Sequence, residues 1–84
     1  MKQNEILREQ IFETIRNQIK NNEPPETKLT FDRLKTMGYS DFETNQLIGQ
    51  CVASELFKLL KFKEPFDQKR YVNNLKNLPK APFE

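Results

Sequence analysis

The sequence predicts an all-α fold, a small globular domain of four helices with a long third helix at its centre. Three observations support this prediction. The 84-residue chain contains only two glycines, and its prolines fall near the ends of periodic segments. Apolar residues recur with a helical period in four segments. The predicted helices span about residues 5–21, 25–37, 41–61 and 68–78.

Length and composition limit the organisation further. A chain of this size forms one domain, 1–84, with a modest core that buries roughly 60–65% of the unfolded surface. No apolar run approaches the ~20 residues of a membrane span, and the first residues lack the apolar segment of a signal peptide. The single cysteine excludes an internal disulfide and fits a reducing compartment. We therefore expect a cytoplasmic protein without membrane contact.

The first helix, 5–21, carries an apolar stripe about 140° wide. The stripe consists of Leu7, Ile11, Phe12, Ile15 and Ile19. Pro24 and Pro25 end this helix and suit the first turn of the next one. The second helix is followed by Gly38 and Tyr39, which fit the left-handed C′ position and the apolar C″ position of a Schellman motif.

The third helix is expected to touch partners on more than one side. Ser40 and Glu43 have the spacing of a capping box at its start. Its apolar arc, about 140° wide, comprises Phe42, Ile48, Gly49, Val52, Ala53, Leu56, Leu59 and Leu60. Leu47 and Phe57 lie on the far face. Gly49 is interpreted as a point where a neighbouring helix approaches closely; a break into two shorter helices is the alternative.

The fourth helix has a marked start and end. Asp67 is its expected cap, and Phe66 and Tyr71 occupy the two positions of a hydrophobic staple. Its apolar face, about 120° wide, consists of Tyr71, Val72, Leu75 and Leu78. Pro79 stops the helix, and residues 79–84 are expected to form an irregular tail.

Few residues offer catalytic chemistry. The chain has no histidine, which removes the commonest general base and metal ligand, and it has no glycine-rich phosphate loop. Cys51 lies in mid-helix beside the buried arc, where a structural thiol is expected. Glu55 is a candidate partly buried acid, paired with Arg70, Lys58 or the Tyr71 hydroxyl; structural pairing is favoured over catalysis. We expect no enzymatic activity, no cofactor and no metal.

The turn between the second and third helices resembles two known motifs. In a DNA-binding helix-turn-helix the recognition helix presents its N-terminal residues to DNA. Here that helix begins with Asp41, Phe42 and Glu43 and has no cation before Lys58, which is the wrong polarity for DNA.

The second resemblance is to the ubiquitin-associated domain, whose first loop is similar to L-x-x-M-G-Y-S, here Leu34 to Ser40. In that family the loop and a late Leu-Leu pair bind an apolar patch on ubiquitin. The resemblance would map this role onto Met37, Tyr39, Leu59 and Leu60. The family also needs a loop after its second helix, whereas this chain is predicted to continue through Gly49.

A longer stretch, from Pro24 to Pro79, resembles small helical bacterial proteins that lack an assigned function. The segments GYSD, EPFDQKRY and LKNLP carry this resemblance. It implies a bacterial cytoplasmic helical domain, and it supplies no catalytic residue.

The cations gather toward the end of the chain. Residues 58–80 carry a net charge of +5, which leaves −3 for the rest because the total is +2. The candidate basic patch consists of Lys58, Lys61, Lys63, Lys69, Arg70 and Lys76. Such a patch can serve a nucleic acid or an acidic protein, and a solvated helix face is the simpler interpretation.

Four apolar residues fall off the stripes that explain their helices. These are Ile6, Leu29, Leu47 and Phe57. We hypothesise that some of them converge as a protein-binding or dimer surface; the alternative is that they close the domain's own core. The predicted function is a non-enzymatic protein–protein interaction module that binds an unknown protein or itself. Weak non-specific nucleic-acid binding through the basic region is the alternative.

Overall fold

The structure is a computed structural model that describes residues 2–80, with side chains from residue 7 onward. It contains helices α1 (Lys2–Asn21), α2 (Pro25–Thr36), α3 (Asp41–Phe62) and α4 (Gln68–Asn77). The predicted all-α fold of four helices is confirmed, although α1 begins three residues earlier than predicted. Pro79 and Lys80 follow α4 outside any helix. Residues 81–84 of the predicted tail lie outside the described residues.

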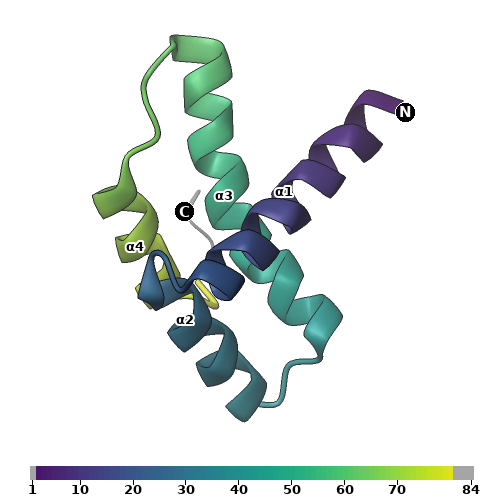
Figure 1. Ribbon diagram of the computed structural model, residues 1–84, viewed down its shortest axis with the longest axis vertical. Coiled ribbons are helices and arrows are strands. Elements are labelled where there is room, and N and C mark those ends of the chain that lie inside the picture. The colour runs from purple at the N-terminus through teal and green to yellow at the C-terminus, as the bar shows by residue number, and fades with distance from the viewer. Residues whose placement is uncertain (1, 81–84) are drawn as a thin grey trace.

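Helix α3 is the longest element and packs against α1, α2 and α4, as expected for the central helix. Helix α2 also contacts the three other helices. Figure 1 shows α1 crossing α3 near the middle, while α2 and α4 lie beside α3 on the opposite side of the crossing from the N-terminus. Above the crossing, the N-terminal half of α1 and the C-terminal half of α3 diverge. None of the four described helices has the length and apolar character needed to cross a membrane.

The turn from α2 to α3 is built by local sequence signals. Gly38 has a φ of 107°, and the backbone N–H groups of Gly38 and Tyr39 donate to the carbonyls of Lys35 and Leu34 at 3.0 and 3.2 Å. These two bonds complete the predicted Schellman motif. The capping box is also present, because Ser40 and Glu43 bond reciprocally at 3.0 and 3.1 Å.

The start of α4 follows its sequence signals as well. The Asp67 carboxylate accepts a hydrogen bond from the backbone N–H of Arg70 at 3.1 Å. The Phe66 and Tyr71 rings form the predicted staple, with centroids 5.3 Å apart in an edge-to-face arrangement. These two contacts fix the direction in which the chain enters α4.

The core draws on every helix. Its buried apolar side chains are Ile15, Leu34, Ile48, Cys51, Val52, Tyr71, Leu75 and Leu78. Helix α3 is continuous through Gly49. A Cβ atom at Gly49 would lie 3.2 Å from the Ile11 side chain, so the glycine permits the close approach of α1, as predicted.

Part of the predicted core face of α3 is exposed. Phe42, Leu59 and Leu60 retain 60%, 41% and 68% of their accessible surface, so the expectation that they are buried is wrong. Phe42 lies in the first turn, at the edge of the bundle. Leu59 and Leu60 belong to the C-terminal half of α3, and that half of the helix diverges from α1 (Figure 1). The ends of α3 therefore extend past the helices that cover its middle.

A buried polar cluster joins α1, α2 and α4. The Gln18 side-chain oxygen accepts hydrogen bonds from the Thr27 and Tyr71 hydroxyls, each at 2.7 Å. Burial raises the pKa of Tyr71 to about 12. In addition, the Arg33 guanidinium donates to the carbonyl oxygens of Leu75 and Leu78 at 3.0 and 2.9 Å. The Leu75 carbonyl also accepts from the Leu78 backbone N–H at 3.2 Å, so Arg33 joins α2 to carbonyl oxygens at the end of α4.

Candidate functional site

An apolar groove lies where α1 and α3 diverge, and we call it the α1–α3 groove. It is a hollow of about 560 Å³ lined by Leu7 and Ile11 of α1 and by Ala53, Leu56, Phe57 and Leu60 of α3. Every one of these lining side chains is apolar. A groove of this composition is the strongest candidate binding site on the described part of the chain.

The spacing of the lining residues explains why they share one groove. The lining residues of α3 share one face of the helix, because Leu56, Phe57 and Leu60 follow Ala53 by three, four and seven positions. On α1, Leu7 and Ile11 are one turn apart. Leu7, Phe57 and Leu60 keep 38%, 52% and 68% of their surface exposed. Among the described residues, part of the apolar surface of each helix is therefore left exposed.

A second, smaller hollow lies beside the helix crossing. It measures about 370 Å³ and shares Leu7, Ile11 and Ala53 with the α1–α3 groove. Its other lining residues are Arg8, Phe12, Gln46, Gly49 and Gln50. The surface thus changes from apolar at the open end to mixed near the crossing.

A cation lies at the outer edge of the groove. The ammonium nitrogen of Lys61 lies 5.3 Å from the centroid of the Phe57 ring and 5.9 Å from that of Phe62. The two rings are 6.2 Å apart and nearly perpendicular. Both rings are more than half exposed, so this cation–π cluster presents charge and apolar surface together.

The four residues predicted to form an interaction surface do not lie together. Phe57 lines the α1–α3 groove. Leu47 is half-buried and packs against the core, which matches the alternative that it closes the domain. Leu29 is 66% exposed on α2 and does not line this groove. The side chain of Ile6 lies outside the described residues.

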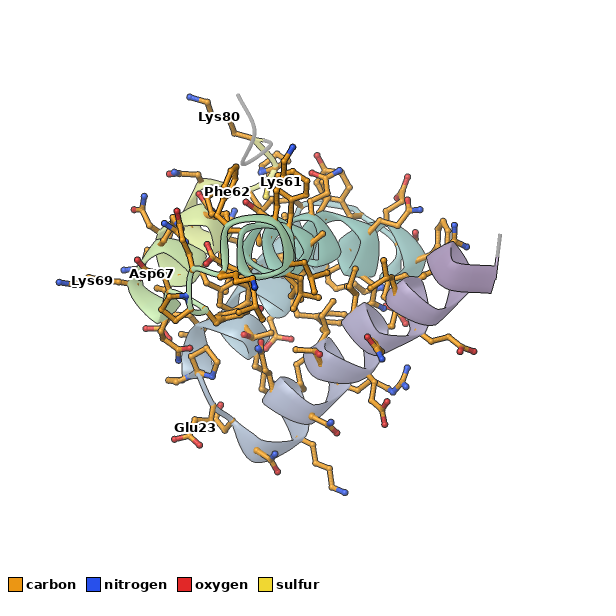
Figure 2. All side chains as sticks on the ribbon, turned by 90° about the horizontal axis from the view of Figure 1, so that it is seen from above. Glu23, Lys61, Phe62, Asp67, Lys69 and Lys80 are labelled. Carbon is orange, nitrogen blue, oxygen red and sulfur yellow. The ribbon has the colours of Figure 1, made fainter. Side chains whose placement is uncertain are left out.

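The predicted basic patch divides into separate groups. Lys69 and Lys76 border a different hollow together with the carboxylates of Glu23, Glu26 and Asp67. Figure 2 shows Lys61 and Phe62 on the same side as Lys80, whereas Lys69 points outward on another side. Lys58 lies 3.5 Å from the Ser54 hydroxyl. The C-terminal cations therefore do not form a single uninterrupted surface.

Arg70 is not available to the predicted basic patch, because it forms an ion pair with Glu55. Its Nε and Nη2 atoms donate to the Glu55 carboxylate at 2.7 and 2.9 Å, and the Asp67 backbone N–H donates to the same carboxylate at 3.0 Å. Glu55 is fully buried, more so than the partial burial predicted for it. The hydrogen bond from Arg70 is the main reason that the pKa of Glu55 is lowered. Of the three predicted partners, Arg70 is the one observed.

The remaining reactive group is the Cys51 thiol, which is buried. Burial raises its pKa to about 12, so it stays protonated near neutral pH and is a poor nucleophile. Among the side chains that the structure describes, those of residues 7–80, no group of three or more cysteine, aspartate or glutamate residues is placed to hold a metal ion.

Sequence reasoning missed two features of the structure. It assigned Leu7 and Leu60 to buried stripes, although both line the open groove; their periodicity is that of a core face, and only the divergence of α1 exposes them. It also gave no role to Arg33, whose partners are more than 40 positions away. No local pattern identifies such a distant contact.

Comparison of the chain with models of protein families, with curated proteins and with solved structures gives no match. The functional argument therefore depends on the geometry of the groove.

Proposed function

We propose that this chain is a non-enzymatic interaction module that binds a helix of another protein in the α1–α3 groove. The observation that supports the proposal is the apolar lining of the groove, in which Phe57 and Leu60 are more than half exposed. An apolar groove between two helices is a common receptor for an amphipathic helix, whose apolar residues enter at a spacing of three and four.

The shape of the groove supports a helix as the bound element. Leu7 and Ile11 form one wall, and Leu56, Phe57 and Leu60 form the other. The walls belong to two helices that diverge from a common crossing (Figure 1). A third helix placed between them would contact both walls and restore the coverage that α3 has in its middle.

The two side chains considered for catalysis support a non-enzymatic function in this proposal. Glu55 uses its carboxylate in the pair with Arg70, and the raised pKa of Cys51 makes it unreactive. Nucleic-acid binding has less support, because Arg70 is engaged and Lys69 lies beside acidic side chains.

A matched pair of variants tests the proposal. Leu60→Ala removes an anchor from the groove, whereas Leu29→Ala removes a leucine of nearly equal exposure, 66% against 68%, from outside it. Each tagged variant is used to capture proteins from a cell extract. We expect a partner retained by the parent and by Leu29→Ala but weakened at least about tenfold by Leu60→Ala, as for an interface anchor.

Two results would contradict the proposal. Equal loss of partner binding in both leucine variants would show that the groove is not the binding site. Alternatively, sedimentation analysis could reveal a dimer of the purified chain that Leu60→Ala dissociates. The groove would then belong to a second copy of this chain, and the assignment to another protein would be wrong.

A further inference from the structure

We draw no further inference here: the strongest candidate, the exposed apolar face of the α1–α3 groove around Phe57 and Leu60, belongs to the site already described, and nothing in the structure shows the chemistry of what covers it.

Discussion

Two sides of α3 are built by different means. On one side, polar side chains connect the helices to each other; we call this the polar side. Its members are Gln18, Thr27, Arg33, Glu55, Arg70 and Tyr71. On the other side, the α1–α3 groove is lined by apolar side chains alone. Hydrogen bonds hold the helices together on the polar side, whereas the groove is open to solvent.

The difference follows from what each kind of group requires. A buried carboxylate or hydroxyl must find a hydrogen-bonding partner, so the polar side accepts only one arrangement of helices. Apolar side chains make no such demand and adapt to different neighbours. The polar side therefore specifies the fold, while the groove leaves apolar surface exposed. Substitutions on the two sides should separate stability from binding.

The largest effect is expected at the buried carboxylate. Glu55→Gln removes the charge that accepts three hydrogen bonds from Arg70 and Asp67. It should lower the free energy of unfolding by about 2–3 kcal/mol, because hydrogen bonds to a charged group are the costliest to lose. Urea unfolding measures this change. Glu13→Gln, at an exposed site on α1, should change the free energy by less than about 0.5 kcal/mol, and equal losses would contradict the distinction.

The same carboxylate predicts an acid-dependent loss of stability. Its pKa in the folded protein is lowered from 4.5, mainly by the hydrogen bond from Arg70. The unfolded chain therefore takes up the proton first as the pH falls. The stabilisation is fully present above pH 4.5 and is lost as the pH falls through the folded pKa. Urea midpoints measured at decreasing pH should show a shallower decline in Glu55→Gln; an unchanged slope would argue against this ion pair.

A smaller loss is expected from the polar cluster between helices. Tyr71→Phe removes the hydroxyl that donates to Gln18 at 2.7 Å. The Gln18 oxygen still accepts from Thr27, so no acceptor is orphaned, and the free energy of unfolding should fall by about 1 kcal/mol. Thermal unfolding followed by circular dichroism measures it. Tyr39 is half-buried and lies outside this cluster, so Tyr39→Phe is the control. A larger loss of stability in Tyr39→Phe than in Tyr71→Phe would contradict the role assigned to the cluster.

The smallest effect on stability is expected in the groove. Leu60→Ala should change the free energy of unfolding by less than about 0.5 kcal/mol, since the side chain is 68% exposed. In contrast, Ile48→Ala on the buried face of the same helix should cost roughly 2–5 kcal/mol. Chemical denaturation of both variants makes the comparison. A loss at Leu60 similar to that at Ile48 would show that the groove closes on itself in solution.

The sequence predicted the parts of this fold that depend on neighbouring residues. The Schellman ending at Gly38, the capping box from Ser40 and the Asp67 cap all involve groups within five positions. The pair of Glu55 with Arg70 was also among the predicted options, because it joins opposite charges across the single connection between α3 and α4.

The candidate site was harder to predict because it depends on the relative length and direction of two helices. Periodicity identifies Leu60 as apolar and aligned with Ala53, but it does not reveal that α1 has diverged at that level. Phe57 was singled out because it falls off the predicted stripe. In the structure it belongs to the same groove as residues on that stripe.

The close approach of α1 at Gly49 relates the crossing angle of the two helices to the width of the α1–α3 groove. A Cβ there would lie 3.2 Å from a side-chain atom of Ile11, so this contact can be taken as the pivot for the geometry. Leu60 lies eleven positions further along α3, or about 16 Å at 1.5 Å per residue. A rotation of α1 by about 10° about the pivot would move the facing walls apart by about 3 Å at that level. The crossing angle would thus set the width of the groove at its open end.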